Sequence, residues 1–119
     1  MNVLLLSDDL LFAPRLEAAC RHCGAQLVMV RDAHDLHQAP PAGAAILDLA
    51  MPRCEPGELV PCLRARGVAA IAAYGAHVQR ELLEKARAVG CELVLTRGQL
   101  HAQCESVVSR LVEMGAAGR

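Results

Sequence analysis

The pattern of hydrophobic and polar residues predicts five strands that alternate with five helices. Short apolar runs, typical of strands, occupy residues 2–6, 26–30, 44–49, 68–74 and 92–96. The segments between and after them are predicted to be helical at residues 11–23, 33–38, 58–65, 77–89 and 102–114. The apolar runs are nearly continuous, which indicates strands that are buried on both faces of a sheet.

Glycine and proline residues mark where the predicted helices begin and end. Gly24, Gly67 and Gly90 follow three of the helices and are expected to cap them. Pro14 falls in the first turn of the first helix, where a missing N–H costs little. Pro61 is tolerable in the third helix only if it, too, lies in the first turn.

Strands that alternate with helices through short loops predict an α/β fold. The expected architecture is a five-stranded parallel sheet of the flavodoxin-like (βα)5 type, with strand order 2-1-3-4-5 and helices on both faces. Residues 1–114 are expected to form a single domain and residues 115–119 a frayed tail. In this strand order the winding reverses between the first and third strands, and ligands gather at the carboxyl ends of those two strands.

Composition narrows the classes of function. Hydrophobic residues make up 54% of the chain and aromatic residues only 2%, so Leu, Val, Ile and Ala must build the core. The net charge of −1 argues against binding to nucleic acid or an anionic membrane. No apolar run approaches the ~20 residues that span a bilayer. The first residues, MNVLLLSDD, lack a basic leader, so we expect a cytoplasmic protein.

The six cysteines are expected to be free thiols. Cys20 and Cys23 have the spacing of half a zinc site or of a redox pair. No second CxxC or HxxxH follows downstream, and the pair ends a predicted helix, whereas redox pairs gain their low thiol pKa at a helix N-terminus. A structural role is therefore the preferred interpretation.

Three carboxylates follow or end the first and third predicted strands. Asp8 and Asp9 come directly after the run VLLLS, and Asp48 lies within AILDLAMP. Since these strands are neighbours in the predicted order, the three side chains should converge in one pocket. Like charges at close range repel, and a hard divalent cation such as Mg²⁺ is the simplest reason to tolerate them. An aspartate beside Mg²⁺ can also attack a phosphoryl group. Asp8 or Asp9 could alternatively cap the first helix.

These segments resemble those of response-regulator receiver domains over nearly the whole chain. The matching pieces are LLLSDD, ILDLAMP and the five βα units, and the spacing from Asp48 to Met51-Pro52 is the most specific of them. The resemblance implies that Asp8 and Asp9 bind Mg²⁺, with the backbone carbonyl of Ala50 as a further ligand. It also implies that Asp48 accepts a phosphoryl group from a histidine kinase.

The chain departs from the receiver pattern at two positions. Receivers place Thr or Ser at the end of the fourth strand, where this chain has Tyr74 or Gly75, with His77 just beyond on the same rim. Receivers place Lys at the end of the fifth strand, where this chain has Arg97. Arg is not a simple substitute for Lys, because its planar fork is longer than a compact ammonium. Arg97 could instead pair with Asp48 or Asp8 and satisfy the pocket without metal or phosphate.

Three hypotheses of function follow. The preferred one is a stand-alone receiver-like, or pseudo-receiver, domain that binds proteins and has a degenerate phosphorylation site. The first alternative is a receiver phosphorylated on Asp48 with Mg²⁺. The second is a small nucleotide-binding protein or enzyme on the same fold, although the acidic loop SDDLL lacks the glycines that grip phosphate. No enzymatic activity is expected under the preferred hypothesis.

The expected partner is a protein, such as a histidine kinase or a downstream signalling protein. The resemblance implies that the partner, or a second copy in a homodimer, binds the surface formed by residues 77–89, 92–96 and 102–114; a monomer is the other possibility. Four arginines could line that surface: Arg80, Arg87, Arg97 and Arg110.

Overall fold

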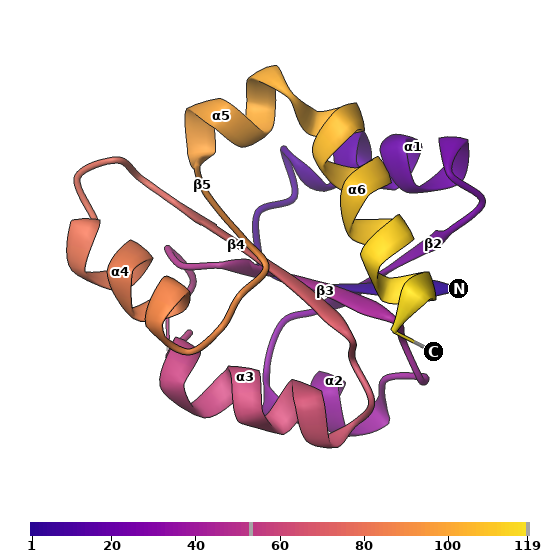
Figure 1. Ribbon diagram of the computed structural model, residues 1–119, viewed down its shortest axis with the longest axis horizontal. Helices are drawn as coiled ribbons and strands as arrows, with labels where there is room; N and C mark the ends of the chain where they lie inside the picture. Colours follow the sequence, from indigo (N-terminus) through magenta and orange to yellow (C-terminus); the bar gives the residue numbers. More distant parts are fainter. Residues whose placement is uncertain (53, 119) are drawn as a thin grey trace.

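The computed structural model, which describes residues 1–52 and 54–118, is a parallel sheet between two layers of helices (Figure 1). The strands are β1 (Asn2–Leu6), β2 (Gln26–Val30), β3 (Ala44–Asp48), β4 (Ala70–Gly75) and β5 (Leu93–Thr96). The helices are α1 (Ala13–His22), α2 (Ala33–Gln38), α3 (Pro56–Ala65), α4 (Arg80–Ala88), α5 (Arg97–Ala102) and α6 (Cys104–Ala117). The strand order is β2-β1-β3-β4-β5, and every pair is parallel, which confirms the predicted topology.

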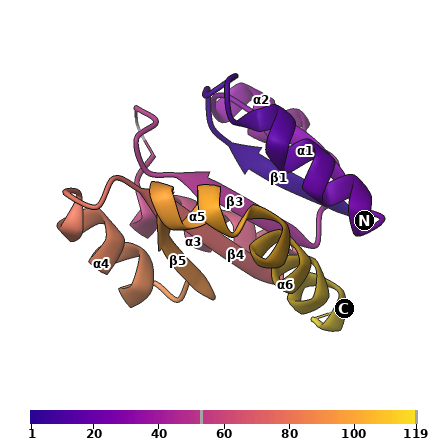
Figure 2. The same ribbon diagram turned by 90° about the horizontal axis from the view of Figure 1, so that it is seen from above.

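Each face of the sheet has its own hydrophobic core. Alternate residues of β1 point to opposite faces, so Leu5 packs with residues of α1, α5 and α6, and Leu4 packs with residues of α2, α3 and α4. Figure 2 shows the two helical layers on either side of the strands. β3 and β4 are buried along their whole length, which explains why their sequences read as continuous apolar runs.

The largest departure from the sequence prediction lies after β5. A short helix, α5, occupies residues that were expected to be a loop, and α6 follows it after Gln103. The signal was present as a capping box: the Thr96 side chain accepts from the Gln99 N–H, and the Gln99 side chain accepts from the Thr96 N–H. α6 packs on α1 and over β3 and β4, so the helices that lie beside β5 are α4 and α5 (Figure 1).

Two smaller predictions were wrong. Pro61 lies inside α3, because the helix begins at Pro56 and not near Glu58 as expected. Pro61 therefore removes one helical hydrogen bond in the helix interior. The last helix, expected to end at residue 114, continues to Ala117, and Gly115 packs closely against the backbone of Gly43. Fraying of residues 115–119 stays a prediction, and Arg119 lies outside the described residues.

The glycine caps behave as predicted. Gly24, Gly67 and Gly90 adopt positive φ angles of 73°, 90° and 94°, a conformation that L side chains rarely adopt. Across the described parts of the chain, no helix is both long and apolar enough to span a membrane.

Candidate functional site

The carboxyl ends of β1, β3, β4 and β5 bring the predicted site residues to one edge of the sheet. Leu6 lies opposite Leu47 in the register of β1 and β3, so Ser7 follows directly beside Asp48. Asp48 in turn lies opposite Tyr74 in the register of β3 and β4. The predicted convergence of the acids that close the first and third strands is therefore present.

Asp48 is a buried carboxylate whose two oxygens are both hydrogen bonded within the chain. Its exposed fraction is 2%. The Ser7 hydroxyl donates to Oδ2 at 2.7 Å, and the Ala50 N–H donates to Oδ1 at 3.0 Å. Hydrogen bonds of this kind offset the cost of burying a charge. The contact from Ala50 is made by its N–H; the metal-binding role predicted for its carbonyl stays a prediction.

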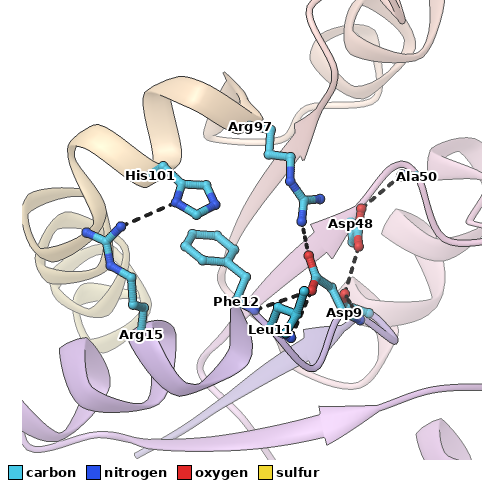
Figure 3. Close-up of polar contacts among 9 residues, drawn as sticks. Asp9, Leu11, Phe12, Arg15, Asp48, Ala50, Arg97 and His101 are labelled. Atoms are coloured by element: carbon cyan, nitrogen blue, oxygen red, sulfur yellow. Dashed lines mark hydrogen bonds and ion pairs between the residues drawn. The ribbon is translucent and has the colours of Figure 1, made fainter.

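Asp9 makes polar contacts with several other residues at this edge of the sheet (Figure 3). Its Oδ1 accepts from the backbone N–H of Leu11 at 3.0 Å and of Phe12 at 3.3 Å, while Oδ2 pairs with the Arg97 guanidinium. The Asp9 N–H donates to the Ser7 hydroxyl oxygen at 3.0 Å. Ser7 therefore connects the two acids, because its oxygen accepts from Asp9 and its hydrogen is donated to Asp48.

The ion pair of Arg97 differs from the one that was expected. Arg97 pairs with Asp9, and not with Asp48 or Asp8. The reason is local: the two loop N–H groups orient the Asp9 carboxylate toward the first residue of α5. Asp8 is exposed and makes no side-chain hydrogen bond to another described residue. Asp8 thus stays at the rim, while Asp9 and Asp48 form the inner site.

Tyr74 occupies the position beside Asp48 at the end of β4. The side chain is 1% exposed, and its hydroxyl has no hydrogen-bond partner among the described residues. The ring meets Phe12 edge-on, with centroids 6.0 Å apart and an interplanar angle of 76°. Burial raises the pKa of the Tyr74 phenol well above its usual range, and the nearby Asp48 charge adds to the rise. The phenol therefore stays neutral.

The other two residues predicted for the switch region have different surroundings. Gly75 is buried, and a Cβ there would lie 3.2 Å from Leu49 Cβ, so a larger residue would crowd the loop after β3. His77 is exposed and lies in the loop before α4, not in the helix predicted from residue 77. Among the described residues, no hydrogen bond joins His77 to Asp8, Asp9 or Asp48.

Sequence reasoning missed two residues that shape the site. Ser7 was noted only as part of the strand end, yet it links the two acids. Phe12 was not distinguished from the rest of the first helix, yet it packs between Tyr74 and His101. The scarcity of aromatic residues was the available signal, because a chain with one Phe and one Tyr places both here.

Two of the three carboxylates predicted to bind magnesium already have partners within the described residues, and the metal-binding role of all three stays a prediction. Hydrogen bonds engage both oxygens of Asp48, and Arg97 engages Asp9. Within residues 1–52 and 54–118, no group of three or more His, Cys, Asp or Glu side chains is arranged to hold a metal ion. A divalent cation that binds Asp9 Oδ2 would compete with the Arg97 guanidinium, which already supplies one positive charge there.

Comparison with protein-family models and with curated proteins gave no match. Comparison with solved structures did. Full-length FixJ from B. japonicum superposes with a TM-score of 0.75 at 17% identity, covering 96% of this chain, which spans 58% of the FixJ chain. The receiver domain of a response regulator from Bermanella marisrubri superposes with a TM-score of 0.72 at 20% identity, covering 93% of this chain and 97% of that one.

A third solved structure carries a metal. The receiver domain of the sensor histidine kinase PA1611 from Pseudomonas aeruginosa, which has magnesium coordinated in its active-site cleft, superposes with a TM-score of 0.71. It is 19% identical, and the match covers 94% of this chain and 97% of that one. The chain described here therefore has the fold of response-regulator receiver domains.

Proposed function

We propose that this chain is a receiver-like signalling module that acts by binding a protein partner and has a degenerate phosphorylation site. The observation that carries the proposal is the state of Asp48, which is buried and has hydrogen bonds on both oxygens. A phosphoacceptor must present a free oxygen to the phosphorus in line with the leaving group. Each Asp48 oxygen keeps a second lone pair beside its hydrogen bond, but the carboxylate is only 2% exposed and would have to become accessible first.

The ion pair supports the same proposal. With Arg97 on Asp9, one of the three acids at this edge has a cationic partner without Mg²⁺. Tyr74 or Gly75 stands where a receiver has a small hydroxyl residue, and neither offers one: Gly75 has no side chain, and the Tyr74 ring is packed against Phe12. A buried ring of this size cannot swing toward a phosphoryl oxygen as a Thr hydroxyl can, because protein cores are closely packed.

The partner is proposed to be a histidine kinase or a downstream signalling protein, met in the cytoplasm. The surface beside β5 supports this, since all four residues of that edge strand are partly exposed and α4 and α5 flank it. The same surface could hold a second copy of the chain. Arg80 and Arg110 are exposed on α4 and α6, whereas Arg87 pairs with Glu84. We propose no enzymatic activity.

A second candidate is a phosphorylatable receiver, favoured by the convergence of Asp8, Asp9 and Asp48 at one edge with a cation from β5–α5. Magnesium in the PA1611 receiver domain shows what such an edge can hold in another protein. The two candidates differ in one measurable respect, which is whether Asp48 forms an acyl phosphate.

The test is incubation with acetyl phosphate or phosphoramidate and Mg²⁺, followed by intact-protein mass spectrometry. We expect no added phosphoryl group, while a competent receiver domain in the same tube is modified. A mass increase of one phosphoryl group that is lost in Asp48→Ala would overturn the proposal in favour of the second candidate. Titration with MgCl₂ alone, followed by calorimetry, separately measures whether the cation displaces Arg97.

A further inference from the structure

The short helix α5 is held on the loop between β1 and α1 by two side chains one turn apart. Arg97 and His101 are four residues apart and so lie on one face of the helix. Arg97 pairs with Asp9, and the His101 ring stacks on Phe12 with centroids 4.1 Å apart and an interplanar angle of 17° (Figure 3). Arg15 of α1 also contacts His101, with Nη1 3.3 Å from His101 Nδ1.

Few features of α5 itself would hold it in this position. It is six residues long, far below the ~12 residues at which an isolated helix becomes even marginally stable. Gly98 lowers its helix propensity. Leu100 is its one buried residue. The docked position of α5 therefore depends on Leu100, on its junctions with β5 and α6, and on the two contacts with the loop.

The loop under α5 is apolar apart from the acids. Phe12 is buried because Tyr74 meets one side of its ring and His101 stacks on a face. Leu10 and Leu11, just before it, are 60% and 94% exposed. Movement of α5 away from the loop would uncover the Phe12 face beside these two leucines and enlarge the exposed apolar surface.

We propose that α5 is a clasp that opens as one unit when Asp9 loses its pairing with Arg97, and that opening uncovers Phe12 next to Leu10 and Leu11. The charge at Asp9 is thereby coupled to the surface beside β5. The coupling needs no phosphoryl group on Asp48. The clasp shares one observation with the proposed function, which is the ion pair between Arg97 and Asp9.

The test is amide hydrogen exchange of the full chain with residue-level readout over residues 97–103. Asp9→Asn and Arg97→Gln both remove the ion pair, and Asp9→Asn keeps an oxygen for the Leu11 and Phe12 N–H groups. Each should speed exchange of the α5 amides by about threefold, as expected for one partly exposed ion pair. The double variant should exchange no faster than either single variant, since both remove the same contact.

Matched variants make the result decisive. Arg87→Gln removes an ion pair confined to α4 and should leave exchange in α5 unchanged. His101→Ala should speed exchange across α5 by about fivefold, and His101→Phe, which keeps an aromatic stack, should restore wild-type exchange. Faster exchange only at residue 97, additive effects in the double variant, or unchanged exchange in Asp9→Asn and Arg97→Gln would each overturn the clasp. No phosphoryl donor is present, so the result is independent of whether Asp48 can be phosphorylated.

Discussion

At the scale of single residues, the site is organised by a serine between two carboxylates. Ser7 donates to the buried Asp48 and accepts from the Asp9 N–H, so one hydroxyl serves both acids. The Asp48 carboxylate is held in place by neutral donors, and the only side-chain cation that pairs with either acid in the described chain is Arg97 on Asp9. Asp48 is therefore held by hydrogen bonds from neutral groups, whereas Asp9 is ion-paired with the first residue of α5.

Ser7→Ala should lower the free energy of unfolding by about 1–3 kcal/mol, because it leaves a buried carboxylate oxygen and a backbone N–H without their partner. Urea unfolding followed by circular dichroism measures the change. Ser106→Ala is the matched control, since Ser106 is exposed and only donates to the Gln103 carbonyl; its effect should stay within about 0.5 kcal/mol. Equal effects of the two variants would contradict the role given to Ser7.

At the scale of elements, patterns that report burial predicted most of the fold. The strands were predictable because residues buried on both faces must be apolar throughout, and the positive-φ glycines because few other residues adopt that conformation. α5 was not predicted, since a six-residue helix has too few positions to show a 3.6-residue period. The Arg97–Asp9 pair was not predictable either, because it depends on how two loop N–H groups turn one carboxylate.

Two glycines in the last helices should respond oppositely to alanine. A Cβ on Gly115 would lie 2.8 Å from the Gly43 carbonyl oxygen, so Gly115→Ala must shift α6 and should cost about 1–3 kcal/mol of stability. A Cβ on Gly98 meets nothing within 4 Å, and Gly98→Ala should stabilise α5 by about 0.5–1 kcal/mol. Thermal and urea unfolding of both variants checks the signs. Stabilisation by Gly115→Ala would show that α6 does not approach β3 as described.

At the scale of the whole molecule, buried residues packed on the two faces of the sheet connect the acid site to other parts of the chain. Asp48 is at the centre of the carboxyl edge, Tyr74 and Phe12 lead from it to α5, and Cys54 lies on the other side of the sheet core. The convergence of the acids could be predicted from topology, because parallel strands end at one edge. The chemistry of that edge could not, since burial and hydrogen bonding of Asp48 emerge only from packing in three dimensions.

Packing also gives stability a specific dependence on alkaline pH. Burial raises the pKa of the Cys54 thiol from 9.0 to about 12, with the Asp48 charge adding to the rise, and burial raises those of Cys20 and Cys91 to about 11. The unfolded chain releases these protons near pH 9 while the folded chain keeps them. Stability is therefore fully present below pH 9 and falls as pH rises from 9 toward 11–12.

Each such thiol contributes at most about 1.4 kcal/mol of lost stability per pH unit in this window. Cys54→Ala should consequently reduce the slope of unfolding free energy against pH between 9 and 11 by up to about 1.4 kcal/mol per unit, even though it lowers stability at neutral pH by leaving a small cavity. Urea unfolding under reducing conditions at several pH values measures both effects. A slope that is unchanged in Cys54→Ala would mean that this thiol ionises as readily in the folded chain as in the unfolded one, and that the core beside Asp48 is open to water.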